Sequence, residues 1–137
     1  MAFPPSKAMA NALDEARAAA KRGEVPVGAV ITDATGTVIA QAGNRTRELA
    51  DPTAHAERLI GCTLTVTLEP CAMCAAAIAA ARLERVVYGA SDLKSGGVEH
   101  GARVFSHPQA HHRPEVVSGV AEAECAALLK DFFAGRR

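Results

Sequence analysis

The stretch from Thr63 to Cys74 reads T-L-T-V-T-L-E-P-C-A-M-C and joins two elements of different kinds. Residues 63–68 are expected to form a strand. Proline at position 70 suits the start of a helix, and alanine-rich sequence then continues to about Ala81. A strand therefore leads directly into a helix whose first turn carries two cysteines.

Cys71 and Cys74 form a candidate metal site. Residues three apart are neighbours on a helix surface, so both thiols can reach one metal ion. The positive end of the helix dipole favours the thiolate form that a metal needs. His55 supplies a third, nitrogen ligand. Two cysteines and one histidine leave one tetrahedral position of Zn(II) open for water, which is typical of a catalytic site.

Glu57, two residues after His55, completes this candidate site. A carboxylate beside a zinc-activated water can accept its proton and pass it to a leaving group. The pair of motifs H-x-E and P-C-x-x-C is a signature of zinc-dependent base deaminases. The alternative is a closed structural zinc site, which needs a fourth Cys or His at ligand spacing. Cys62 and Cys125 belong to no second paired motif and are expected to pack as small hydrophobes.

The composition of the chain describes one globular unit. With 137 residues, the chain is expected to form a single domain, residues 1–137. Its formal net charge is zero, so any RNA binding must be local. Four cysteines favour a reducing compartment over a disulfide framework. We see no leader or membrane-spanning stretch and expect a cytoplasmic protein.

Helix caps, turn residues and hydrophobic periodicity predict the remaining helices and strands. Helices and strands alternate along the chain, as in an α/β fold. Two antiparallel strands form an early hairpin, and later parallel strands would place the site at their carboxyl ends. The expected elements are a helix at Ser6–Arg22 closed by Gly23, strands at Val25–Thr32 and Thr37–Ala42, a helix from Pro52, a strand at Val86–Ala90, a short helix near Ala102–Ser106, a strand at Glu115–Val120, and a last helix from about Ala121 with Cys125, Leu128, Leu129, Phe132 and Phe133 on one face.

Several blocks resemble the bacterial tRNA-specific adenosine deaminases of the cytidine-deaminase-like superfamily. The blocks are E-V-P-V-G-A-V at 24–30, Asn44-Arg45, D-P-T-A-H-A-E at 51–57, V-T-L-E-P-C-A-M-C at 66–74, R-V-V-Y-G-A at 85–90, D-x-K at 92–94 and the closing D-F-F-A-G-R-R. The resemblance implies a three-layer α/β/α fold with a five-stranded mixed sheet. It also implies one Zn(II) per chain and a homodimer that binds the anticodon stem-loop of a tRNA.

The resemblance further implies a reaction and a set of site residues. Zinc-activated water would deaminate adenosine to inosine at the wobble position. The implied residues are His55, Cys71 and Cys74 as zinc ligands, Glu57 as proton shuttle, Asn44, Val27, Ala56 and Pro70 around the target nucleoside, and Arg45, Asp92, Lys94, Arg136 and Arg137 as candidates for RNA contact. Without the resemblance, the D-x-K turn reads equally well as a solvated loop, and the terminal arginines as an ordinary helix end.

The chain departs from the family pattern between Glu57 and Pro70. Only 12 residues separate them, and the strand uses about half. That leaves too few for a usual helix and turn, since a mean helix has about 11 residues. Three explanations stay open: a segment omitted from the sequence, a genuinely shortened form, or a stub helix from Pro52 to Ile60 closed by Gly61.

Two other functions compete with tRNA deamination. The same zinc chemistry could deaminate a free base or nucleoside, of the guanine or cytosine type. Alternatively, the domain could be a non-catalytic, zinc-stabilised RNA-binding or partner subunit. A histidine cluster, His107, His111 and His112, lacks a Cys or acidic partner, so we interpret it as surface histidines rather than a second metal site. We expect His100 to be exposed.

Overall fold

A computed structural model describes residues 6–43, 60–110 and 112–135. The elements in these ranges are α1 (Lys7–Lys21), β1 (Gly28–Thr32), β2 (Val38–Gly43), β3 (Thr63–Leu68), α4 (Ala72–Ala81), β4 (Arg85–Ala90), the 3-10 helix η1 (Val104–Ser106), β5 (Glu115–Val117) and α5 (Glu122–Ala134). No helix within the described ranges is long and apolar enough to cross a membrane.

The first helix begins and ends as its sequence predicts. The Ser6 hydroxyl accepts a hydrogen bond from the backbone N–H of Met9 at 3.1 Å, which is the usual N-cap interaction. The helix ends at Lys21, and Gly23 follows with φ of +82°. Glycine adopts this left-handed conformation without a steric penalty, so it terminates the helix cleanly.

The strands form one mixed sheet in the order β2-β1-β3-β4-β5. β1 is antiparallel to both β2 and β3, whereas β3, β4 and β5 run parallel. α4 connects the parallel neighbours β3 and β4. The carboxyl ends of these two strands therefore lie together, next to the first turn of α4.

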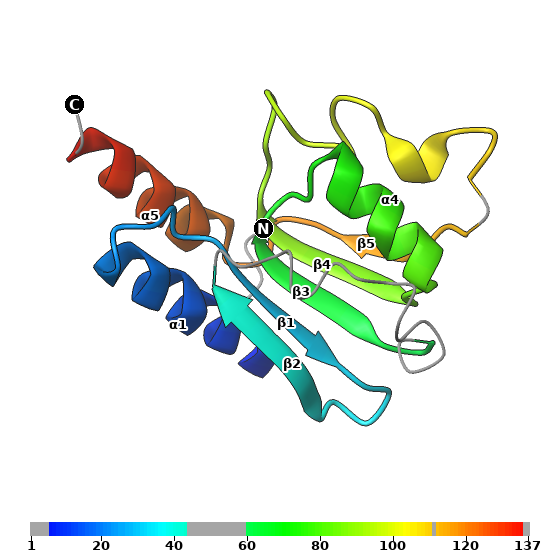
Figure 1. Cartoon of the computed structure of the whole chain (residues 1–137), viewed down its shortest axis with the longest axis horizontal. Coiled ribbons are helices and arrows are strands. Elements are labelled where there is room, and N and C mark those ends of the chain that lie inside the picture. The colour runs from blue at the N-terminus through cyan, green and yellow to red at the C-terminus, as the bar shows by residue number, and fades with distance from the viewer. Residues whose placement is uncertain (1–5, 44–59, 111, 136–137) are drawn as a thin grey trace.

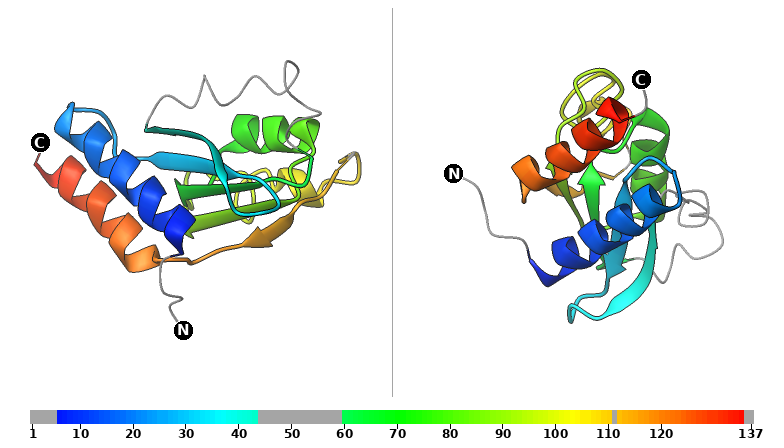
Figure 2. Two further views of the ribbon diagram at one scale, coloured as in Figure 1. Left: turned by 90° about the horizontal axis from the view of Figure 1, so that it is seen from below. Right: turned by 90° about the vertical axis from the view of Figure 1, so that its left-hand side faces the viewer.

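Helices cover both faces of the sheet (Figures 1 and 2). α1 and α5 lie side by side on one face, whereas α4 and η1 lie on the other. Each face has its own buried apolar cluster, one centred on Tyr88 and Ile78 beneath α4 and the other on Met9 and Leu13 of α1. The arrangement confirms the expected three-layer α/β/α fold with a five-stranded mixed sheet.

α1 packs directly on the backbone of β1 at Gly28. A Cβ atom added to Gly28 would lie 1.9 Å from the carbonyl oxygen of Ala12 and 2.7 Å from the nitrogen of Ala16. Ala12 and Ala16 are themselves fully buried. Small residues on the helix and glycine on the strand thus allow a helix–sheet distance that any larger side chain would increase.

The structure corrects two expected strand ends and the burial of one residue on α5. β1 begins at Gly28 rather than Val25, because the N–H of Val27 donates to the carbonyl of Val25 in a tight turn. β5 ends at Val117 rather than Val120, because Gly119 has φ of +77° and turns the chain out of the sheet. On α5, Cys125 is buried as expected, but Phe133 is 53% exposed.

The expected helix from Pro52 lies outside the described residues up to residue 59, whereas the rest of the short interval before Pro70 is described. The described chain resumes at Ile60 and enters β3 through a turn at Gly61, whose φ is +82°. The stub-helix interpretation therefore stays a prediction.

Candidate metal centre

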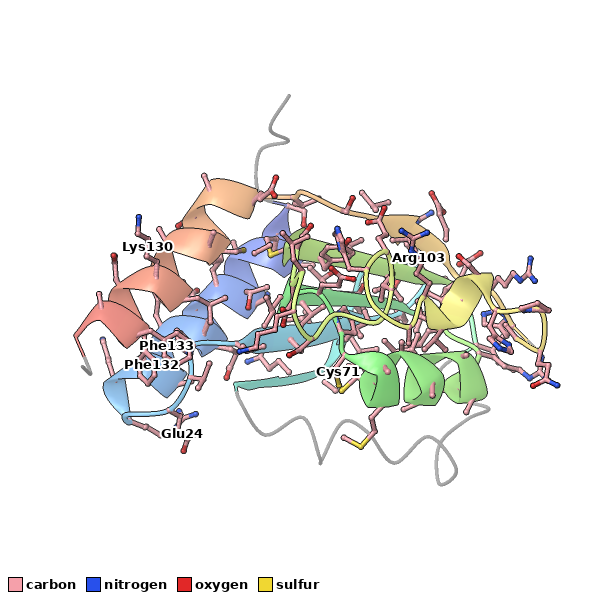
Figure 3. The ribbon with its side chains drawn as sticks, turned by 90° about the horizontal axis from the view of Figure 1, so that it is seen from above. Glu24, Cys71, Arg103, Lys130, Phe132 and Phe133 are labelled. Atoms are coloured by element: carbon pink, nitrogen blue, oxygen red, sulfur yellow. The ribbon has the colours of Figure 1, made fainter. Side chains whose placement is uncertain are left out.

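Cys71 and Cys74 meet at the point where β3 leads into α4. Cys71 is the N-cap residue, with extended backbone angles of φ −71° and ψ 174°, and Cys74 lies in the first helical turn. An N-cap side chain faces the free N–H groups of that turn. Cys71 thus comes near Cys74 from the N-cap position, three residues before it in the chain. Figure 3 shows Cys71 at this end of α4.

The pKa values of the two cysteines shift in opposite directions. Burial alone would raise the pKa of Cys71, but hydrogen bonds from the backbone N–H of Cys74, from its thiol and from the N–H of Met73 lower it below its ordinary value. Burial raises the pKa of Cys74 to about 11, helped by its hydrogen bond to Cys71 and the negative charge there. Of the two, Cys71 therefore ionises more readily.

This pair fits a zinc ion. Two soft sulfur donors lie together at a helix N-terminus, and a divalent cation bound there would take both sulfurs as thiolates. Neither cysteine forms a disulfide. Within residues 6–43, 60–110 and 112–135, no group of three His, Cys, Asp or Glu side chains could hold a metal. The pair thus needs a further ligand, for which His55 is predicted.

Several predicted site residues lie outside the described residues, so their positions stay predictions: Asn44, Arg45, His55, Ala56, Glu57, Arg136 and Arg137. Two others are described. Val27 is half-buried against the apolar cluster beneath α4, and Pro70 is buried with its carbonyl accepting the N–H of Gly97 at 2.8 Å. Both therefore lie on the side of the sheet that carries the cysteine pair.

The D-x-K segment forms a compact turn after β4. The Asp92 carboxylate accepts the backbone N–H groups of Lys94 at 3.1 Å and Ser95 at 2.9 Å. Leu93, 77% exposed, and the exposed Lys94 form the tip of the turn. Asp92 thus shapes the turn, and the Lys94 side chain is exposed at its tip.

Glu69 is a site residue that sequence reasoning missed. Its side chain is fully inaccessible, and its carboxylate accepts the backbone N–H of Asp92 at 3.0 Å and the Nδ1 of His100 at 2.7 Å. Burial alone would raise the pKa of Glu69, but these and further hydrogen bonds lower it, so the carboxylate stays charged. The sequence signal was an acidic residue between an apolar strand and Pro70, where a charged side chain is buried only if it has partners.

The other histidines and cysteines have structural surroundings. His100 was expected to be exposed, but it is half-buried. Its side chain is only 32% exposed, because it pairs with Glu69. His107 accepts the N–H of Gln109, and His112 contacts the carbonyl of Leu83 at 2.6 Å, so the two bind different backbone segments. His111 lies outside the described residues. The two remaining cysteines, Cys62 and Cys125, are buried in separate apolar clusters, as expected.

Comparison with known proteins shows the family to which the chain belongs. Residues 4–90 match the cytidine and deoxycytidylate deaminase zinc-binding region. The chain belongs to this deaminase family. A tRNA-specific adenosine deaminase of Agrobacterium fabrum is 54% identical to it over 94% of this chain and 93% of that protein. A tRNA-specific adenosine deaminase of Haemophilus influenzae is 42% identical over 96% and 84%.

A solved structure from a study of tRNA:A34 deaminases that edit the wobble position has a TM-score of 0.78 to this deaminase. It is 51% identical and covers 89% of this chain and 98% of its own. The deaminase is also shorter than its Agrobacterium relative within the matched region. Their alignment spans 143 positions, although this chain has only 137 residues, so the relative carries residues without a counterpart here. This difference agrees with the short interval between Glu57 and Pro70.

Proposed function

We propose that the chain deaminates adenosine to inosine at the wobble position of a tRNA anticodon. The observation that carries the proposal is the joint likeness in sequence and fold to a tRNA:A34 deaminase, at 51% identity and a TM-score of 0.78. The chain itself brings Cys71 and Cys74 together at the carboxyl end of β3, as that chemistry requires.

The chain's residues divide the work of this reaction. His55, Cys71 and Cys74 would hold one zinc ion, which would lower the pKa of a water molecule toward neutrality. The first turn of α4 directs its backbone N–H groups at Cys71 and so stabilises the negative charge of the ligands. Glu57 takes a proton at its carboxylate and delivers it to the departing amino group. Asn44, Val27, Ala56 and Pro70 hold the base.

The first experiment compares substrates. The purified protein is incubated with an anticodon stem-loop that carries adenosine at the wobble position, and inosine is measured by nuclease digestion and chromatography. We expect inosine from this hairpin and none when the adenosine is moved one position along the loop. Turnover of free guanine or cytosine without turnover of the hairpin would reject the tRNA assignment.

The same proposal includes RNA contacts and a location. Lys94, exposed at the tip of its turn, would meet a phosphate of the anticodon loop, with Arg45, Arg136 and Arg137 as further contacts. Asp92 would contribute by shaping the turn. We place the protein in the cytoplasm, because none of its four cysteines, which all lie within the described residues, forms a disulfide, and because its substrate is a tRNA.

The proposed homodimer would bury the outer face of α4. This ten-residue helix reads A-M-C-A-A-A-I-A-A-A and has no charged side chain. Ala72, Met73, Ala76 and Ala80 are exposed on it, with Met73 at 76%. A helix that is apolar all round is normally covered, and a second copy of the same flat, small-residue face would cover it at close range.

Ala76→Glu should therefore convert the dimer to a monomer, because each interface would gain two buried charges. Sedimentation equilibrium measures the change. Ala123→Glu, on the exposed side of α5, is the matched control and should leave the dimer intact. Equal masses for wild type and Ala76→Glu would place the interface elsewhere.

A further inference from the structure

A single buried carboxylate binds both ends of the segment from Asp92 to His100. Oε1 of Glu69 accepts the backbone N–H of Asp92 at 3.0 Å and the Nδ1 of His100 at 2.7 Å. Oε2 accepts three consecutive backbone N–H groups, those of Val98 at 3.2 Å, Glu99 at 3.0 Å and His100 at 3.1 Å. Charge-assisted bonds of this kind are stronger than neutral ones, so Glu69 closes the segment into a fixed loop.

The same loop lies against the cysteine pair. Gly97 donates its N–H to the carbonyl of Pro70 at 2.8 Å, and Gly96 pairs with Cys71 in a β-bridge. A Cβ atom on Gly96 would lie 2.6 Å from the Glu69 carboxylate, and one on Gly97 would lie 2.4 Å from the nitrogen of Ala72. The loop thus rests directly on the turn that carries Cys71, without room for another side chain.

The tip of the loop offers two contact groups. The Asp92 carboxylate folds the tip by accepting the N–H groups of Lys94 and Ser95. Leu93 is 77% exposed, although most leucines are buried, and Lys94 is exposed beside it. An apolar side chain next to a cation suits a single-stranded nucleotide, whose base is apolar on its face and whose phosphate is charged.

We propose that Glu69 is a positioning residue for the substrate: by binding both ends of residues 92–100, it holds Leu93 and Lys94 at a fixed place beside the metal centre, where they contact a nucleotide next to the target base. Glu69 itself touches no substrate. This inference rests on the proposed function, since the nucleotide belongs to the anticodon loop. Glu69 would increase the affinity for the nucleotide by preorganisation, because a loop that is already ordered loses less conformational entropy on binding.

The test is Glu69→Gln, which keeps the size of the side chain but replaces one acceptor oxygen by an NH2 group that faces N–H donors. We expect KM for the anticodon stem-loop to rise about tenfold, with kcat and zinc content unchanged. Glu84→Gln, an exposed acid at the start of the next strand, is the matched control and should change neither parameter. His100→Ala removes part of the same set of bonds and should raise KM less.

A double-mutant cycle separates positioning from general structural damage. Glu69→Gln should add no further increase in KM to a Leu93→Ala/Lys94→Ala variant, because the groups that it positions are then absent. The inference would be overturned if Glu69→Gln raised KM by the same factor in the Leu93→Ala/Lys94→Ala variant as in the wild type. A fall in kcat or a loss of zinc would also overturn it. If Glu69→Gln does not fold, His100→Ala goes through the same cycle. A wild-type protein without activity on the hairpin rejects the proposed function instead, so the two failures are distinct.

Discussion

Glu57→Ala is expected to slow inosine formation on the anticodon stem-loop strongly and to leave one zinc ion bound. The carboxylate is expected to move a proton from water to the departing amino group, whereas the predicted zinc ligands are His55, Cys71 and Cys74. General acid–base catalysis contributes about 10²–10⁴-fold to a rate. We therefore expect kcat to fall by at least about 10²-fold, with little change in KM. Single-turnover kinetics measure the rate of deamination, and mass spectrometry measures the zinc content.

Glu84→Ala serves as the control for this substitution, because Glu84 is an exposed acid away from the first turn of α4. Its activity and zinc content should match those of the wild type. Undiminished activity of Glu57→Ala would remove Glu57 from the mechanism. Loss of zinc together with activity would instead make Glu57 part of the ligand set.

Cys74→Ala loses the zinc ion and, with it, the deaminase activity. Cys74 lies inside α4, where alanine is the best helix former, so the helix itself should persist. The remaining ligands, Cys71 and His55, cannot complete a site of the three-ligand catalytic type. We expect the zinc content to fall from about one per chain to near zero, with the helical circular-dichroism signal preserved.

Cys125→Ala is the matched control for Cys74→Ala, since Cys125 is also a cysteine inside a helix but is buried against β4 on the other face of the sheet. Truncation there leaves a small cavity and costs about 1 kcal/mol of the free energy of unfolding. It should keep zinc and activity. Equal zinc content in Cys74→Ala and wild type would show that α4 does not carry the metal.

Local signals in the sequence explain the elements that were predicted well. The N-cap at Ser6 and the glycine at position 23 set the ends of α1 through contacts within a few residues. Likewise, the strand Thr63–Leu68 and the helix after it follow from nearby residue types. The cysteine pair belongs to the same class, because N-cap geometry brings Cys71 to Cys74 without help from the rest of the fold.

The sequence by itself thus determined the order of the described α/β elements and most of their ends, and it predicted the two sulfur ligands, since each depends on neighbours along the chain. Only the tertiary structure decided the role of Glu69, whose partners lie 23 to 31 residues away. It also decided that Gly28 must be a glycine, because α1 approaches β1 there within contact of its backbone. Both features depend on groups that meet only when the sheet and the helices pack. No local sequence pattern shows which distant groups will meet.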